Sequence, residues 1–238
     1  MIVLGVDTAL DDVSAGLLLP DGRVVERSFR HERDALRRLA GLVRDVLREG
    51  DVRARDLDVV ACTRGPGSFT GIRVGVSAAR ALADACGARM AGVSTLRALC
   101  MAAEAREGDV RLALIGCRPG EVYAGLYRLL PGGPWEAVRP DAALALTALA
   151  DWLSGAGVAG RVELAGPAAA SGAEALAGAG LPGLDLCVRR DLSRVRVRDV
   201  LEAAVQDARS GRLLDPLDLV PEYLRPSQAE IRASSGGG

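Results

Sequence analysis

Two segments of the sequence carry residues that could act on a phosphate group, and the first is Asp7-Thr8. These residues follow an apolar run at residues 2–6, so a carboxylate and a hydroxyl come directly after a predicted strand. An acid in such a turn can position a metal-bound water, and a hydroxyl with neighbouring N–H groups can face phosphate oxygens. The alternative is a hairpin turn in which both side chains bond only to nearby backbone groups.

The second segment is the glycine-rich stretch 64–75, which reads RGPGSFTGIRVG. Gly65, Gly67 and Ser68 precede a predicted helix, whose first N–H groups could face an anion. The stretch is not a Walker A loop, because the chain has no lysine. It is not a dinucleotide fingerprint either, because Gly65, Gly67 and Gly71 are spaced two and four apart. The alternative is a tight strand-to-helix turn, capped by the hydroxyl of residue 68 or 70.

Composition limits the classes of protein to which the chain can belong. Of its 238 residues, 49% are hydrophobic and 26% charged, which is typical of a folded globular protein. The net charge is −1, whereas a stand-alone nucleic-acid binder normally carries a positive excess. We therefore expect any contact with RNA to depend on other subunits.

Five scattered cysteines without a CxxC pair argue against a disulfide or zinc framework, and no segment resembles a signal peptide or a membrane span. A cytoplasmic protein is expected.

Hydrophobic periodicity predicts an α/β protein. The expected strands cover residues 2–6, 13–19, 24–29, 57–62, 90–93, 112–115, 122–129, 161–164 and 185–188. The expected helices cover residues 32–49, 70–86, 94–106, 142–153, 168–177 and 197–209. Residues 226–238 end in a Gly-rich stretch and are predicted to be a disordered tail.

The pattern restarts near residue 110, which indicates an internal duplication. A shift of 109 residues brings four identities into register without a gap: Val13, Ala15, Gly16 and Leu17 fall on Val122, Ala124, Gly125 and Leu126. A hairpin-first βββαβα unit repeated once is the architecture of actin-like and Hsp70-like proteins (the ASKHA, ribonuclease H-like fold). We expect an N-terminal lobe at 1–107 and a smaller, reduced second lobe at 108–225.

The helix predicted after the glycine-rich stretch carries small residues at strict four-residue spacing. Gly71, Gly75, Ala79 and Ala83 form one smooth ridge. A glycine inside a helix costs about 0.5–1 kcal/mol relative to alanine, so two of them imply a gain from close packing. That packing could be against the protein's own sheet or against a partner helix.

Several segments in order resemble the TsaB-like (YeaZ-like) family of bacterial tRNA threonylcarbamoyl-adenosine proteins. They cover nearly the whole chain and are the start at residues 2–8, RGPGSFTGIRVG at 64–75, GVSTL at 92–96, GEVYAGLY at 120–127 and PEYLR at 221–225. The resemblance implies a role in modifying the adenosine next to the anticodon. It implies pairing with the catalytic paralogue TsaD through helices of the first half, association with the ATPase TsaE, contact with tRNA only through the complex, and no membrane. A homodimer in the absence of TsaD is an alternative state.

The implied partner surface lies on two helices of the first half. It comprises Leu36, Leu39 and Val43 on the first helix and the ridge residues Gly71, Gly75, Ala79 and Ala83 on the second. On this interpretation, Gly75→Leu would abolish pairing and leave the monomer folded.

The resemblance also implies that this chain is not the catalyst. The catalytic paralogue carries two metal-binding histidines four residues apart, and alignment on Gly92-Val93 places those positions at Thr95 and Leu99. The only histidine of the chain is His31. We therefore expect no metal site, no catalytic residue and no cofactor held by this chain alone, although a nucleotide at the subunit interface is compatible with the family.

The phosphate-facing turns are expected to be vestigial, namely Asp7 and Thr8 with Gly65, Gly67 and Ser68. The 109-residue offset places Asp7 on Gly116 and Thr8 on Cys117, so the second half has no matching carboxylate. Many TsaB-like sequences have Asp-Ala-Arg where this chain has Gly116-Cys117-Arg118.

Two other functions compete with this interpretation. An ATP-dependent kinase or ATPase of the actin-like class would use Asp7 as its phosphate-side acid, whereas a metallopeptidase is disfavoured because one histidine cannot build a His-based zinc site.

The basic run from Arg189 to Arg198 either contacts tRNA phosphates or an acidic partner, or is simply solvated.

Overall fold

The computed structural model describes residues 1–30 and 35–225, and all side chains of these ranges except those of residues 35–37. His31, the tail predicted at 226–238 and the side chain of Leu36 therefore lie outside the described part of the chain.

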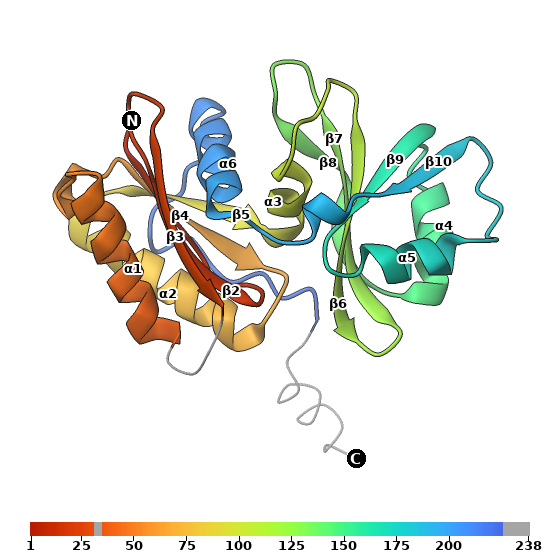
Figure 1. Ribbon diagram of the computed structural model, residues 1–238, viewed down its shortest axis with the longest axis horizontal. Helices are drawn as coiled ribbons and strands as arrows, with labels where there is room; N and C mark the ends of the chain where they lie inside the picture. The colour runs from red at the N-terminus through yellow and green to blue at the C-terminus, as the bar shows by residue number, and fades with distance from the viewer. Residues whose placement is uncertain (31–34, 226–238) are drawn as a thin grey trace, which may run out of the picture.

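Two five-stranded mixed sheets form two lobes that lie side by side (Figure 1). The first sheet consists of β1 (Val3–Asp7), β2 (Asp12–Leu18), β3 (Val24–Arg30), β4 (Val59–Gly65) and β5 (Arg89–Ser94). The second consists of β6 (Val110–Arg118), β7 (Glu121–Leu129), β8 (Trp135–Ala145), β9 (Gly160–Ala165) and β10 (Leu184–Val188). Their strand orders, β3-β2-β1-β4-β5 and β8-β7-β6-β9-β10, are the same, which confirms the predicted duplication and the actin-like fold.

The helices cover both faces of the first sheet. Along β1, Leu4 and Val6 pack on one side with α1 and α2, while Val3 belongs to the core on the other side, as alternation along a strand requires. On that other side, Gly5 lies against the side chains of Leu201 and Val197. The helices involved are α1 (Ala35–Glu49), α2 (Phe69–Cys86) and α6 (Val197–Arg209).

The second sheet has shorter helices on its outer face, namely α4 (Leu149–Ser154) and α5 (Ala169–Leu176). Its inner face packs against α3 (Thr95–Met101), which lies between the two sheets (Figure 1). The prediction of a reduced second lobe is correct in this sense, because the five strands are retained and the helices are short. The two lobes share a core. One buried cluster contains Val93 and Leu99 of the first lobe together with Ala113 and Ile115 of the second.

The division of the chain at residues 107/108 describes the sheets but not the helices. All strands of the first sheet precede residue 95, and those of the second lie between 110 and 188. However, α6 returns to the first sheet and packs on β1 and β2. The segment after it also returns, since Leu214 pairs with Met90 of β5. The sequence interval 108–225 is therefore not one spatial unit.

Two predicted helices are partly wrong. Residues 142–145, predicted as helix, belong to β8, because pairing with β7 outweighs the helix preference of this Ala- and Leu-rich stretch. The helix predicted over residues 94–106 ends at Met101. The carbonyl groups near its end are bound by the guanidinium of Arg111, which replaces further helical hydrogen bonds.

None of the helices in the described ranges is long and apolar enough to cross a membrane.

Candidate functional site

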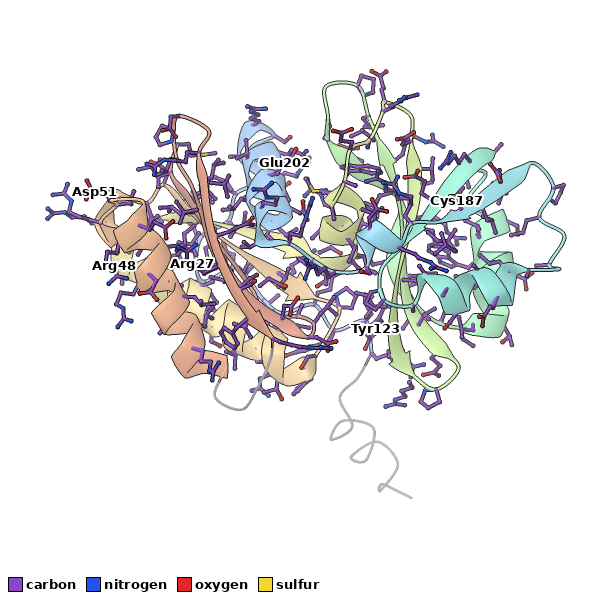
Figure 2. The ribbon with its side chains drawn as sticks, in the orientation of Figure 1. Arg27, Arg48, Asp51, Tyr123, Cys187 and Glu202 are labelled. Atoms are coloured by element: carbon purple, nitrogen blue, oxygen red, sulfur yellow. The ribbon has the colours of Figure 1, made fainter. Side chains whose placement is uncertain are left out.

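The strand-end turns of the two lobes face each other across a cavity of about 350 Å³. The first lobe contributes residues from the β1–β2 turn and the glycine-rich stretch, and the second lobe contributes the end of β6. The lining residues are Ala9, Leu10, Asp11, Gly67, Ser68, Ile115, Gly116, Cys117 and Tyr123. Figure 2 shows Tyr123 at the junction of the lobes. Residues 9–11 of the β1–β2 turn and residues 67–68 of the glycine-rich stretch thus lie opposite the end of β6.

Asp7 does not present its carboxylate to this cavity. The side chain is buried, with 1% of its surface exposed. Its Oδ1 accepts hydrogen bonds from the Thr63 hydroxyl at 2.6 Å and from the Ala9 N–H at 3.1 Å. Burial raises the pKa of Asp7 to about 6, because the surrounding core disfavours its charged form.

Thr8 points toward helix α2 and not toward a phosphate position. Its hydroxyl donates to the carbonyl of Gly71 at 2.7 Å, and a Cβ at Gly75 would overlap the same hydroxyl oxygen. The Thr8 hydroxyl is therefore used within the protein and does not face a phosphate position. Thr8 instead fixes the start of α2 against β1.

The glycine-rich stretch is bound to the protein's own backbone. The N–H of Ser68 donates to the carbonyl of Ala9 at 2.8 Å, and Ser68 Oγ caps α2 by accepting from the N–H of Gly71 at 3.2 Å. Gly65 has a φ of 126°, and a side chain there would overlap the carbonyl of Glu222. The strand-to-helix turn capped by Ser68, the alternative stated for this stretch, is the arrangement observed.

The end of β6 has no acid at the position equivalent to Asp7. In the first lobe, Asp7 of β1 pairs with Ser14 of β2. The 109-residue offset would make Gly116 pair with Tyr123 in the second lobe. In the structure, however, Tyr123 pairs with Ile115, and Gly116 pairs with Val122. With β7 held in that register, the counterpart of Asp7 is therefore Ile115, which is buried and apolar. Asp7 is almost fully buried, its counterpart is apolar, and the glycine loop is bound to its own chain. Asp11 does line the cavity, but no group of three or more His, Cys, Asp or Glu side chains in the described residues could hold a metal ion. These residues do not fit a metal-bound nucleotide.

The small-residue ridge of α2 faces the protein's own sheet. Gly71, Gly75, Ala79 and Ala83 are all buried. Leu39 of α1 is buried in the same core cluster, and Val43 is half-buried against it. The interpretation of the ridge and Leu39 as partner-contact residues is therefore corrected, because their contacts are made within the monomer.

A different row of α2 residues reaches the surface. Val74, Ala78 and Leu82 also recur every four residues and are partly exposed. Ala78 and Leu82 pack at the edge of the cluster that contains Leu42 and Val43 of α1. Sequence reasoning missed this row although its spacing was visible. We call Val74, Ala78 and Leu82 the α2 surface row.

The buried position of Gly75 changes the expected effect of enlarging it. We expect Gly75→Leu to lower the free energy of unfolding by about 3 kcal/mol or more, because the new side chain overlaps Thr8. A Cβ added at Gly41 of α1 would meet no atom within 4 Å, so Gly41→Ala is expected to stabilise by about 0.5–1 kcal/mol. Urea unfolding measures both, and a fully stable Gly75→Leu protein would contradict the packing described.

Protonation of Asp7 makes stability depend on pH. Its folded-state pKa of about 6 exceeds the ordinary value of 3.8, so the folded state binds the proton more tightly, and stability falls as pH rises from 3.8 through 6. Between pH 5 and pH 8 this carboxyl should account for about 1 kcal/mol. Asp7→Asn keeps an acceptor for Thr63 and Ala9 and removes the titration. Urea unfolding at both pH values should show a smaller pH effect in the variant, whereas an equal effect would contradict the assignment.

Comparison with known proteins shows which family the chain belongs to. The model of the TsaD family, described as tRNA N6-adenosine threonylcarbamoyltransferase, matches residues 30–164, which is more than half of the 238-residue chain. The chain belongs to this family, as a TsaB/YeaZ-like protein. The protein named TsaB from Bacillus subtilis is 29% identical over 98% of this chain and 97% of its own length.

Two further relatives agree with this placement. The Escherichia coli protein named tRNA threonylcarbamoyladenosine biosynthesis protein TsaB is 36% identical, over 60% of this chain and 62% of its own length. The solved structure of YeaZ from Pseudomonas aeruginosa has a TM-score of 0.78 and 26% identity, and the match covers 94% of this chain and 99% of that one.

In this TsaB/YeaZ-like chain, the positions aligned with the paralogue's histidines lie inside the core. Thr95 and Leu99 are both on α3 and fully buried. Across the described residues, no group of three or more His, Cys, Asp or Glu side chains could hold a metal ion.

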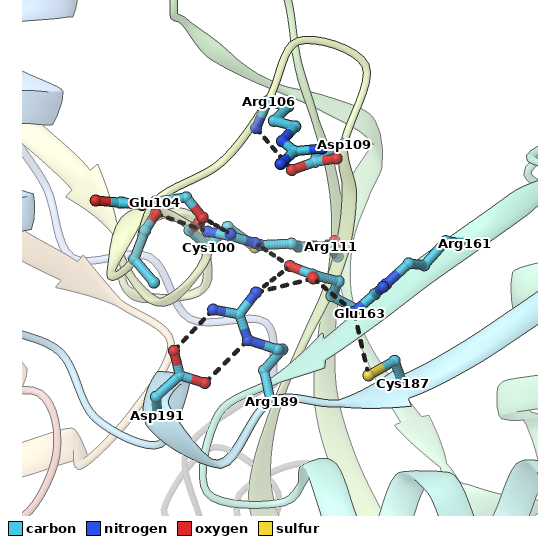
Figure 3. A network of polar contacts seen from close by, with 11 residues as sticks. Cys100, Glu104, Arg106, Asp109, Arg111, Arg161, Glu163, Cys187, Arg189 and Asp191 are labelled. Atoms are coloured by element: carbon cyan, nitrogen blue, oxygen red, sulfur yellow. Dashed lines mark hydrogen bonds and ion pairs between the residues drawn. The ribbon is translucent and has the colours of Figure 1, made fainter.

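The basic run is largely paired within the TsaB/YeaZ-like fold. Arg189 binds Asp191 at 2.7 Å and Glu163 at 2.8 Å (Figure 3). Arg196 binds Asp199 at 2.9 Å, and Arg198 lies 3.4 Å from a carboxylate on β3. These three arginines have internal partners. Arg190 and Arg194 are exposed, so contact with tRNA phosphates or an acidic partner, or simple solvation, stays open for those two.

Proposed function

We propose that this chain is a non-catalytic pairing subunit in the synthesis of threonylcarbamoyl-adenosine in tRNA, which binds and activates a TsaD-type transferase. The names of its relatives support the pathway. The observation that carries the non-catalytic role is the pair Thr95 and Leu99. A buried hydroxyl and a buried isobutyl side chain occupy the positions at which the paralogue would bind its metal.

Pairing would use the exposed side of α1 and α2. Ala78 and Leu82 of the α2 surface row pack at the edge of the same core cluster as the half-buried Leu42 and Val43 of α1, and the two helices are in contact. Together they present an apolar strip. A pair of helices from a partner can cover such a strip as a four-helix arrangement. The same strip could pair two copies of this chain when the partner is absent.

The other members of the proposed assembly follow from the family. A TsaE-type ATPase would associate with the pair, and tRNA would be contacted mainly through the partner, since this chain has a net charge of −1. A nucleotide at the subunit interface would need groups from the partner, because Asp7, Thr8 and the glycine-rich stretch are bound internally.

Sedimentation velocity of this chain mixed with a TsaD-type transferase tests the proposal. We expect a heterodimer at micromolar concentrations, and separate monomer peaks would contradict it. The competing ATPase function is tested alongside, since it requires ATP hydrolysis by the purified chain that disappears in Asp7→Ala. The burial of Asp7 predicts no such hydrolysis.

A further inference from the structure

A cluster of exposed apolar side chains lies on the first lobe. In the described ranges, five large hydrophobic residues are exposed: Met1 at 44%, Phe69 at 43%, Leu217 at 77%, Val220 at 58% and Tyr223 at 44%. All except Met1 lie at the start of α2 or on the segment 217–223. Large apolar side chains gathered on one surface are typical of interaction sites, whereas scattered ones need no explanation.

The segment 217–223 runs along α2 in the opposite direction. Near one end, the guanidinium of Arg80 donates to the carbonyl of Leu217 at 3.4 Å. Near the other end, the Tyr223 ring lies 5.0 Å from the Phe69 ring, centroid to centroid. Because residues 69 and 80 are about three turns apart, the segment follows the helix over that length.

This segment is fixed in place, so its exposed side chains are part of a built surface. Leu219 is fully buried in the core of the first lobe. The N–H of Glu222 donates to the carbonyl of Arg64 at 2.7 Å, and the Glu222 carboxylate lies 3.1 Å from the Arg64 guanidinium. Leu217, Val220 and Tyr223 thus remain exposed although the chain around them is anchored.

The charge beside the aromatic pair is positive. The Arg73 guanidinium lies 5.2 Å from the Phe69 ring centroid, and no carboxylate of the described residues pairs with it. Arg80 bonds to a backbone carbonyl and not to an acid. The exposed acids Asp218 and Asp84 lie toward the Arg80 end of the surface, and Glu222 is paired with Arg64. Arg73 is therefore the charge that stands next to the aromatic pair.

We propose that Phe69, Arg73, Leu217, Val220 and Tyr223 form a docking patch for an apolar segment that carries carboxylates, supplied by the TsaD-type partner. This inference rests on the proposed function. Arg73 complements an acidic group, and the aromatic pair offers an anchor of the kind that dominates protein interfaces. The exposed aliphatic side chains Leu217 and Val220 favour a protein over RNA, because they offer nothing to a phosphate backbone.

The docking patch is separate from the α2 surface row. At about 100° per residue, Arg73 lies roughly 140° around α2 from Ala78. The patch and the row therefore occupy opposite flanks of one helix, and substitutions can test them separately.

Titration of a purified TsaD-type transferase against labelled variants of the full chain tests the docking patch. We expect Phe69→Ser with Tyr223→Ser to raise the Kd about 10–100-fold, since loss of aromatic anchors is typically costly. We expect Arg73→Glu to raise the Kd and to reduce its dependence on salt. Leu181→Ser, at a partly exposed apolar position of the second lobe, serves as the matched control and should leave the Kd unchanged.

The outcomes separate this inference from the proposed function. An unchanged Kd in all patch variants, with tight binding by the wild type, would overturn the patch and leave the pairing function intact. Variants that lose only binding to purified tRNA would also overturn it, because the surface would then be an RNA site. No binding by the wild-type chain would overturn both.

Discussion

The Ala78→Glu variant is expected to lose association with a TsaD-type transferase, with the Kd raised at least 100-fold. Ala78 lies at the middle of the α2 surface row, between Val74 and Leu82 one turn away on either side. A carboxylate there would have to be buried without a partner when another apolar surface covers the row, and an unpaired buried charge is strongly unfavourable.

Ser171→Glu provides the matched control for this prediction. Ser171 is exposed on α5 of the second lobe, away from both surfaces of α2. The two variants add the same charge to a helix and differ in the surface that carries it. Sedimentation velocity should show a heterodimer for Ser171→Glu and not for Ala78→Glu, with both monomers folded by circular dichroism. Equal behaviour of the two variants would contradict the placement of the interface.

The Arg111→Met variant is expected to lose about 3–5 kcal/mol of unfolding free energy, as is typical when a buried charge pair loses one member. Arg111 on β6 is fully buried, and its guanidinium lies 4.8 Å from the Trp135 ring centroid. Its Nε donates to Glu163 at 2.9 Å, while its other nitrogens donate to the carbonyls of Cys100 and, at 2.8 Å, Glu104 (Figure 3). Removing the guanidinium leaves these carbonyls, at the end of α3, without their donor.

Arg161→Met is the control, because Arg161 is an exposed arginine that pairs with Glu163, the same carboxylate that Arg111 binds. It lies 3.4 Å from Glu163, and 60% of its side chain is exposed. An exposed ion pair contributes about 0–1 kcal/mol, so this variant should remain close to wild type in urea unfolding. If Arg111→Met unfolded at the same urea concentration as Arg161→Met, the role of Arg111 in joining α3 to the second sheet would be contradicted.

The repeated fold could be predicted from the residues because each half begins with a hairpin of similar sequence. Val13 to Leu17 and Val122 to Leu126 are the central parts of β2 and β7, which occupy equivalent positions in the two sheets. The strand β8 could not be predicted in the same way, since Ala142 to Ala145 has helix-forming composition and becomes a strand only through its pairing with β7.

The site was harder to predict because spacing shows which residues share a helix face but not what that face contacts. The spacing of Gly71 and Gly75 correctly indicates a surface for close approach. The structure shows that the approaching group is Thr8 of the same chain. The direction of the Asp7 carboxylate likewise depends on Thr63, which lies 56 residues away in the sequence.

Reconstituted tRNA modification tests the central claim most directly. Purified TsaD-type transferase, tRNA and an activated threonylcarbamoyl donor are combined with and without this chain, and threonylcarbamoyl-adenosine is measured by mass spectrometry of the digested tRNA. Modification is predicted to require both proteins, with none from this chain and tRNA alone. Formation of the modified nucleoside by this chain without a transferase, or full activity of the transferase without this chain, would contradict the account.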